Sequence, residues 1–346
     1  MLTVQCLEVV AEAVTPISLE PYCGSALRGA FFQALWRRFC TNRESPTCSA
    51  CPLVAACPVA SLVAPLRDEA PRGRDIPRPY VISPPYKKEH HYEPGEMLTF
   101  RLTLIGNNTK LFPYVIRSFQ EMERAGFGHP LPGLHGRRGR FSVRQVRAYH
   151  PFTAEQQVLW ESGSTHPQKP QILVTFADIA ERAKQIPTDQ ISVDFLSPTR
   201  LIVDGHLLKS PDFRVLVLRL LGRLEQLFQE YGEQELTSRD KNVPVFNRDW
   251  YDNLEAEARD IRLVRDETYW VDIKSYSARQ KQYSPIGGFI GKAVFEGDFK
   301  DLREMLVWGE LLHVGKNAVK GDGLYRLEAE GASDRNQSKQ IEVRTF

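Results

Sequence analysis

A stretch near the C-terminus combines residues that can bind a phosphate with residues that can transfer a proton. It reads LLHVGKNAVKGDGLY and covers residues 311–325. Glycine permits positive φ angles and lets backbone N–H groups approach a ligand closely. Successive N–H groups in a turn can bind a phosphate, and lysines add positive charge. The same glycines can instead do no more than close a turn between a helix and a strand. We predict an RNA-backbone-binding loop whose candidate residues are Gly315, Gly321, Gly323, His313, Lys316 and Lys320.

Four cysteines are spaced like the ligands of a single metal ion. Cys40, Cys48, Cys51 and Cys57 follow the pattern C-x7-C-x2-C-x5-C. The two-residue gap between Cys48 and Cys51 lets one turn present two thiolates to the same metal. We expect a structural, tetrahedral zinc site here. An iron–sulfur cluster uses the same ligands, and this cluster and unligated reduced thiols stay open as alternatives.

Composition and charge exclude several classes of protein. The chain has 346 residues, 42% hydrophobic and 25% charged, which is ordinary for a soluble globular protein of about two domains. The net charge of +2 gives no global basic field, so an RNA site has to come from local clusters. No apolar run approaches the length that spans a bilayer. The N-terminal residues lack the pattern of a signal peptide, and we expect a cytoplasmic location with no membrane partner.

Hydrophobic periodicity predicts a mixture of strands and helices in both halves of the chain. In the first half we expect strands over 2–14, 80–82, 97–105 and 141–149 and helices over 25–39 and 111–125. In the second half we expect strands over 171–176, 191–195, 269–273 and 324–327 and helices over 210–231 and 298–312.

One order of elements occurs twice. A helix, a basic glycine-containing loop and a strand follow one another in residues 111–149 and again in residues 298–327. Two copies of a β-α-β-β-α-β unit account for this duplication. We therefore predict an α+β protein with two tandem ferredoxin-like (RRM-like) domains, over 1–165 and 166–328. The first carries a cysteine-rich, metal-binding insertion at about 40–66, and residues 329–346 form a polar tail.

Basic residues alternate with aromatic residues in KSYSARQKQYSPIGGFIGKAVFEG, residues 274–297. Such interleaving suits phosphate contacts combined with stacking of RNA bases. A second basic group follows the helix of the first half, in the loop of residues 126–140. A solvated basic surface is the alternative for helical arginines such as Arg28. Besides the three loop glycines, the predicted RNA-binding residues are Arg279, Lys281, Lys292, Arg137, Arg138, Arg140 and Arg28.

Four stretches of the second half resemble one known family in the right order. They are SPTRLIVDG at 197–205, RLLGRLEQLFQEYG at 219–232, SARQKQYSPIGGFIGKAVFEG at 277–297 and HVGKNAVKGDGLY at 313–325. The chain resembles the CRISPR-associated endoribonuclease that processes precursor CRISPR RNA, a member of the RAMP superfamily. The first half resembles the family more weakly, through GSALRGAFFQAL at 24–35 and the cysteine loop.

The resemblance implies metal-independent cleavage of CRISPR repeat RNA into mature guide RNAs. In that reaction the 2′-hydroxyl attacks the adjacent phosphate and leaves a 2′,3′-cyclic phosphate and a 5′-hydroxyl. Such a step needs a base, an acid and positive charge on the phosphorane. Histidine suits the proton transfers because its pKa lies near neutral pH. His313 and Lys316 are our predicted catalytic residues, and no catalytic metal is expected.

Two departures from the family pattern matter. His313 stands where the superfamily's Gly-x-Gly loop has its first glycine, and residues 15–60, which often hold the family's catalytic histidine, contain none. The lack of histidine in residues 15–60 favours a non-catalytic RAMP-type RNA-binding subunit of a CRISPR effector complex as the alternative function, whereas His313 beside the loop opposes it. In both cases the expected partner is CRISPR repeat RNA, with a CRISPR effector complex as a further partner.

Overall fold

A computed structural model describes residues 2–66, 76–85, 90–106, 109–232, 248–277 and 282–328. The chain divides into two compact units. The first consists of Met1–Phe176, Gln226–Lys241 and Val319–Gly321, and the second of Ala177–Glu225, Asn242–Ala318 and Asp322–Phe346. The domain boundaries inferred from the sequence stay predictions, and the predicted tail over 329–346 lies outside the described residues.

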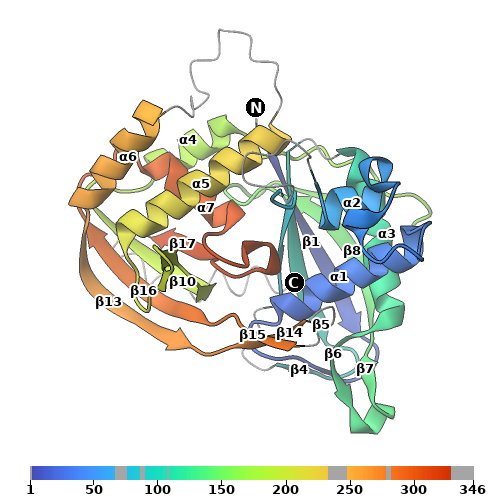
Figure 1. Cartoon of the computed structure of the whole chain (residues 1–346). Helices are drawn as coiled ribbons and strands as arrows, with labels where there is room; N and C mark the ends of the chain where they lie inside the picture. The colour runs from blue at the N-terminus through green and yellow to red at the C-terminus, as the bar shows by residue number, and fades with distance from the viewer. Residues whose placement is uncertain are drawn as a thin grey trace. The chain divides into compact units, whose positions relative to one another are not determined.

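The first unit is built on a five-stranded antiparallel sheet with the order β3-β5-β1-β8-β9 (Figure 1). Its strands and helices alternate as the pattern of the sequence predicts. The elements are β1 (Val4–Ala13), β2 (Ile17–Ser18), α1 (Gly24–Phe39), α2 (Pro58–Val63), β3 (Tyr80–Ser83), β4 (His91–Tyr92), β5 (Met97–Ile105), α3 (Phe112–Ala125), β6 (Phe127–Leu131), β7 (Arg137–Gly139), β8 (Phe141–Tyr149) and β9 (Gln156–Glu161).

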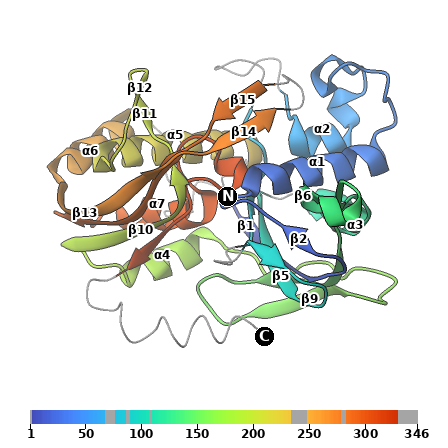
Figure 2. The same ribbon diagram turned by 90° about the horizontal axis from the view of Figure 1, so that it is seen from below.

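The second unit has a four-stranded antiparallel sheet with the order β13-β16-β10-β17. A small hairpin, β11 with β12, stands out from it (Figure 2). The elements are α4 (Phe176–Lys184), β10 (Gln190–Thr199), β11 (Ile202–Val203), β12 (His206–Leu207), α5 (Phe213–Tyr231), α6 (Arg248–Asp260), β13 (Arg262–Val271), β14 (Lys274–Ser277), β15 (Gln282–Pro285), β16 (Gly288–Glu296), α7 (Arg303–Leu312) and β17 (Tyr325–Glu328). The first residue of α4 and the last turns of α5, from Gln226, are counted with the first unit.

Both sheets follow one topology. In the first unit the chain passes through β1, α1, β3, β5, α3 and β8, and in the second through β10, α5, β13, β16, α7 and β17. In each case the first strand lies between the third and the fourth, and the second strand is at the edge. This is the ferredoxin-like arrangement of a β-α-β-β-α-β unit. The predicted α+β class with ferredoxin-type domains is confirmed, whereas a metal-binding insertion is not shown.

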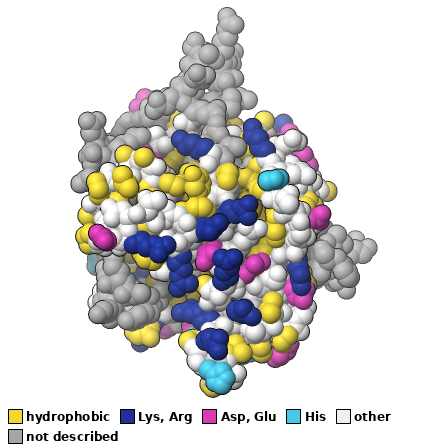
Figure 3. Space-filling model, turned by 90° about the vertical axis from the view of Figure 1, so that its right-hand side faces the viewer, with side chains coloured by type: hydrophobic (Ala, Val, Ile, Leu, Met, Phe, Trp, Pro, Cys, Tyr) yellow, Lys and Arg dark blue, Asp and Glu magenta, His cyan; other side chains and the backbone are white. Residues whose placement is uncertain are grey.

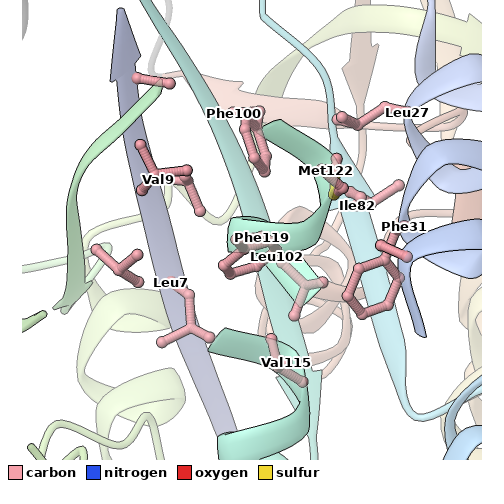
Figure 4. Packing of buried hydrophobic residues seen from close by; sticks show 14 of the residues in the cluster. Leu7, Val9, Leu27, Phe31, Ile82, Phe100, Leu102, Val115, Phe119 and Met122 are labelled. Atoms are coloured by element: carbon pink, nitrogen blue, oxygen red, sulfur yellow. The ribbon is translucent and has the colours of Figure 1, made fainter. Parts of the chain in front are cut away.

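Aromatic and aliphatic side chains from the helices and the sheet form the core of the first unit (Figure 4). Phe119 of α3 lies between two other rings, 6.0 Å from Phe31 of α1 and 5.6 Å from Phe100 of β5 between ring centres. All three are at most 1% exposed. Burial of such side chains is the dominant favourable contribution to folding, so α1 and α3 are fixed on one face of the sheet.

The second core is organised in the same way. Phe213 of α5 contacts Phe295 of β16, with ring centres 5.0 Å apart, and Phe299, which precedes α7, at 5.4 Å. Phe195 of β10 contacts Phe289 of β16 at 4.9 Å. These contacts fix α5 and the start of the α7 segment to the central strands, and so determine where α7 ends. Among the described residues, no helix is both long and apolar enough to cross a membrane.

Candidate functional site

The predicted loop begins where α7 ends. His313 follows the last helical residue with φ 61° and ψ 164°, and its N–H donates to the Gly309 carbonyl oxygen at 2.9 Å. A positive φ is unusual for a residue other than glycine. His313 thus adopts backbone angles suited to glycine, the residue that the family pattern has at this place. The chain then turns and enters β17.

Residues at and just beyond the end of β10 hold this loop by accepting hydrogen bonds from its backbone N–H groups. The N–H of Gly323 donates to the Pro198 carbonyl oxygen at 3.0 Å, and the N–H of Leu324 donates to the Ser197 hydroxyl oxygen at 2.8 Å. The N–H of Lys316 donates to the Arg200 carbonyl oxygen at 3.0 Å. Residues 197–200 are the SPTR part of the first motif, so the first and last motifs of the second half lie against each other.

Two of the loop glycines are required by this close backbone approach. A Cβ atom on Gly315, whose φ is 79°, would lie 2.5 Å from the Arg200 carbonyl oxygen. On Gly323, with φ 72°, it would lie 1.8 Å from the Val314 carbonyl oxygen. Any larger residue would force the backbone apart at either place. The glycines therefore have a structural role, and their binding of a phosphate stays a prediction.

The third loop glycine belongs to the first unit together with Val319 and Lys320. Within that unit, a Cβ on Gly321 would lie 2.6 Å from the Ile82 carbonyl oxygen in β3. A Cβ on Gly24 would lie 1.7 Å from the Lys320 carbonyl oxygen. The first residue of α1 therefore lies directly against Lys320, and glycine is needed there too.

The two predicted catalytic residues have opposite environments. His313 is 2% exposed, whereas the Lys316 side chain is exposed. The Nδ1 atom of His313 lies 3.2 Å from the Asp322 carbonyl oxygen. A carbonyl oxygen can only accept, so this contact assigns the proton to Nδ1 and makes Nε2 the acceptor in a neutral ring. The tautomer suits a base, but the ring reaches RNA only if the loop moves.

Arg223 is a residue near the loop whose role the sequence did not reveal. It lies on α5, and its Nε donates to the Leu312 carbonyl oxygen, the last of α7, at 2.8 Å. The residue is partly exposed, whereas its Nη2 atom is buried. Burial lowers the pKa of Arg223 to about 10. A cation at the C-terminal end of a helix interacts favourably with the helix dipole. Arg223 therefore helps to fix the end of α7, which His313 follows directly.

Tyr325, the last residue of the stretch 311–325, belongs to the core. It is 1% exposed, and its hydroxyl donates to the Leu306 carbonyl oxygen at 2.6 Å. Burial raises its pKa well above the usual value. The glycine at position 309 leaves room for this ring, because a Cβ there would lie 1.9 Å from the hydroxyl oxygen. Tyr325 therefore anchors β17 to α7.

The predicted RNA-binding residues of the second unit are only partly described. Lys292 on β16 donates to the Glu328 carboxylate at 2.9 Å, and this hydrogen bond raises the lysine pKa. Its charge is thus balanced within the sheet. Arg279 and Lys281 lie outside the described residues. RNA contacts by all three stay predictions.

The basic residues of the first unit are more accessible. Arg137, Arg138 and Arg140 are exposed at and beyond β7, and Arg138 Nη1 donates to the Gly128 carbonyl oxygen at 3.0 Å. Figure 3 shows Lys and Arg side chains gathered on one face of the molecule, with Asp and Glu side chains among them. Arg28 points its guanidinium toward the Phe32 ring at 5.8 Å and opposes the burial that raises the pKa of Tyr80.

The cysteine loop brings its thiols near one another without a formed metal site. Burial raises the pKa of Cys48, and charge on Cys57, Cys40 and Cys51 raises it further. The Asn42 side-chain amide lies 3.6 Å from the Cys51 sulfur. In the part of the chain that the structure describes, no three His, Cys, Asp or Glu side chains are arranged to hold a metal ion.

Two family models match the chain. The model described as CRISPR-associated endoribonuclease Cas6 matches residues 193–325, from β10 into β17. A model described as an N-terminal domain matches residues 2–172. None of the curated proteins compared with the chain matches it. The first match contains the SPTR segment and the glycine loop whose contacts are described above.

Solved structures share the fold at low sequence identity. A Cas6 product complex aligns with a TM-score of 0.52 and 17% identity over 94% of this chain and 100% of that chain. The Cas6 of Thermus thermophilus gives 0.50 and 16% over 95% and 99%. A partial Cas6-RT-Cas1–Cas2 complex gives 0.56 and 12%, over 95% of this chain and 46% of that one. These similarities support the fold, and the family-model match shows that residues 193–325 are similar to the CRISPR-associated endoribonuclease Cas6.

Proposed function

We propose that this protein is an endoribonuclease that cleaves CRISPR repeat RNA in precursor transcripts without a catalytic metal. The observation that carries the proposal is the match of residues 193–325 to the CRISPR-associated endoribonuclease Cas6 family. The exposed arginines of β7 and the exposed Lys316 supply positive charge for a phosphate backbone. Association with a CRISPR effector complex and a cytoplasmic location stay predictions.

The proposed step is an internal transfer at one phosphate. A base takes the proton of the 2′-hydroxyl, the 2′-oxygen forms a bond to phosphorus, and the bond from phosphorus to the 5′-oxygen breaks. An acid protonates the leaving oxygen, which gives a 2′,3′-cyclic phosphate and a 5′-hydroxyl. We assign the proton transfer to His313, whose Nδ1 contact with the Asp322 carbonyl sets Nε2 as acceptor, and charge stabilisation to Lys316.

Cleavage in excess EDTA tests this proposal. We expect a cognate repeat RNA to be cut equally well with and without EDTA, because no step uses a metal. Replacing the 2′-hydroxyl at the cleaved position by hydrogen should abolish cleavage and leave binding intact. EDTA-sensitive cleavage would contradict the metal-independent mechanism.

A non-catalytic RNA-binding subunit is the second candidate function. It is favoured by the burial of His313 and by the absence of histidine from residues 15–60. The same experiment separates the two candidates. Tight binding of the cognate repeat RNA with no product at any pH would establish the binding subunit in place of the enzyme.

We further propose that the cysteine loop binds a structural metal ion, zinc rather than an iron–sulfur cluster. The donors fit such an ion by their chemistry, because all four are sulfur atoms and Cys48 and Cys51 have the two-residue gap of zinc ligands. When bound, the ion would join the two short 3-10 turns Cys48–Ala50 and Val54–Ala56 to the end of α1. It would take no part in RNA cleavage.

Metal analysis of the purified protein tests the cysteine loop. We expect about one zinc ion per chain, and its loss in the double variant Cys48→Ser, Cys51→Ser together with a lower Tm. Cys23→Ala, which changes a buried cysteine outside the loop, should keep the metal. Wild-type protein that carries no zinc, with or without iron, would contradict the proposal.

A further inference from the structure

Arg200 is bonded on two sides to different segments of the second unit. Its Nη1 donates to the Gly287 carbonyl oxygen at 2.9 Å, between β15 and β16. Its own carbonyl oxygen accepts from the N–H of Lys316 in the glycine loop at 3.0 Å. A half-buried side chain and the main chain of one residue thus connect segments that are far apart in the sequence.

The backbones around Arg200 approach so closely that little movement is possible. A Cβ on Gly288 would lie 2.5 Å from the Thr199 carbonyl oxygen, and one on Gly315 would lie 2.5 Å from the Arg200 carbonyl oxygen. On the far side, a Cβ on Gly287 would lie 2.3 Å from the Val271 carbonyl oxygen at the end of β13. The guanidinium therefore acts on a junction where β10, β13, β16 and the glycine loop meet.

The segment that Arg200 holds is the base of the β14–β15 hairpin. Lys274 pairs with Pro285 across this hairpin, and the Ile286 N–H donates to the Ile273 carbonyl oxygen at 2.8 Å. The hairpin continues β13 and β16 as one long ribbon (Figure 1). It presents the exposed Lys274 and a Tyr283 that is 69% exposed. A lysine and an accessible aromatic ring are the groups that bind a phosphate and stack on a base.

We propose that Arg200 is a positioning residue that fixes the β14–β15 hairpin relative to the glycine loop, so that both contact one RNA strand. The inference rests on the proposed endoribonuclease function, because the RNA is that of the cleavage reaction. Arg200 does not touch the reacting atoms. It determines where Lys274 and Tyr283 of the hairpin lie with respect to Lys316.

Arginine suits this role better than lysine because its planar guanidinium has a fixed direction for each N–H donor. A lysine at the same place keeps one donor on a more flexible chain and should restore part of the function. Replacement by alanine removes the contact with Gly287 but leaves the Arg200 carbonyl and its bond to Lys316 chemically unchanged. A loss of function in Arg200→Ala would therefore come from the lost contact with Gly287 at the base of the hairpin.

The test uses the full chain and a cognate repeat RNA. Single-turnover cleavage, RNA affinity and hydrogen exchange of the RNA-free protein are compared for wild type, Arg200→Ala and Arg200→Lys. We expect faster exchange at residues 282–290 in Arg200→Ala and a cleavage rate lower by on the order of 10²-fold, since small misplacements cost about that much. Arg200→Lys should recover most of the rate, and the affinity should fall less than the rate.

Arg303 provides a matched control in the same unit. Its Nη1 donates to the Ile186 carbonyl oxygen at 3.0 Å, which is the same kind of bond away from the glycine loop. Arg303→Ala should lower Tm as much as Arg200→Ala does. Its cleavage rate should stay within about 2-fold of the wild-type rate, because the lost contact lies away from the glycine loop. Equal cleavage by Arg200→Ala and Arg303→Ala would overturn the proposal.

The failure of this inference can be distinguished from failure of the proposed function. If wild type never cuts the repeat RNA, the endoribonuclease proposal fails, and exchange at residues 282–290 and RNA affinity still decide the role of Arg200. Unchanged exchange and affinity in Arg200→Ala would refute it. Should Arg200→Ala not fold, Arg200→Met, which keeps an unbranched side chain but no donor, takes its place with the same expected outcomes.

Discussion

Gly323→Ala is expected to abolish RNA cleavage and to lower the free energy of unfolding by on the order of 4 kcal/mol, because it combines backbone strain with a steric clash. The φ of 72° is costly for alanine, and the new Cβ would lie 1.8 Å from the Val314 carbonyl oxygen and 2.9 Å from its nitrogen. Neither atom can move alone, because both belong to the backbone. Calorimetry and single-turnover cleavage measure the two effects.

Two other glycines separate the causes. Gly205 in the β11–β12 turn has φ 80°, but a Cβ there would meet no atom within 4 Å, so Gly205→Ala should cost only the backbone strain, about 1–2 kcal/mol. Gly29 lies in α1 with open space around it, and Gly29→Ala should gain about 0.5–1 kcal/mol. If Gly323→Ala lowers the free energy of unfolding no more than Gly205→Ala does, the predicted clash with the Val314 backbone does not occur.

Alternating hydrophobicity predicted some strands to the residue. β5 and β8 have the bounds expected from the sequence, 97–105 and 141–149. In β5 the residues Leu98, Phe100, Leu102 and Leu104 are at most 2% exposed, whereas the intervening side chains are less buried. In a strand with one face in the core, buried hydrophobic residues alternate with less buried ones. The local sequence was therefore enough to place this strand.

Other elements lack a clear hydrophobic pattern, and the sequence did not predict them correctly. Helix α6, RDWYDNLEAEARD, was not predicted, because Leu254 and Ala258 are its only buried hydrophobic residues among those described. The strand expected over 171–176 is wrong: Val174 makes one isolated bridge to Val4, and Phe176 begins α4. The helix expected from 298 begins at Arg303, since the Asp298 carboxylate accepts from the N–H of Lys300 at 3.1 Å and holds a turn there.

The candidate site could be located from the sequence but not explained by it. The glycine spacing marked the loop, yet the reason for Gly315 is the carbonyl of Arg200, more than a hundred residues earlier. The burial of His313 depends on how α7 ends and on the carbonyl of Asp322. Contacts of this kind arise when ferredoxin-type strands from distant segments become neighbours, and no local pattern encodes them.

His313 combines a strained backbone with a buried ring, and two substitutions separate these features. Its φ of 61° with ψ 164° lies outside the regions favoured by residues with a side chain, at a cost of about 1–3 kcal/mol. His313→Ala removes the ring and keeps the strain. His313→Gly removes both, so the relieved strain offsets part of the lost ring contacts.

We expect His313→Gly to stay folded, to bind the repeat RNA and to cleave it about 10²–10⁴-fold more slowly, which is the usual contribution of a general acid or base. His313→Ala should cleave as poorly and unfold at a lower temperature than His313→Gly. The wild-type rate should depend on pH through the ring that carries the proton, and this dependence should be absent from the glycine variant. Single-turnover rates between pH 5 and 9 measure it.

Asp204→Gly controls for the backbone, because Asp204 also has a positive φ, 48°, and lies exposed in the β11–β12 turn. It should gain stability and cleave like wild type. Cleavage by His313→Gly at the wild-type rate would mean that the ring only fills the loop and that another group carries the proton. A large loss would have a second consequence: since the ring is 2% exposed without RNA, the glycine loop would have to open when RNA binds.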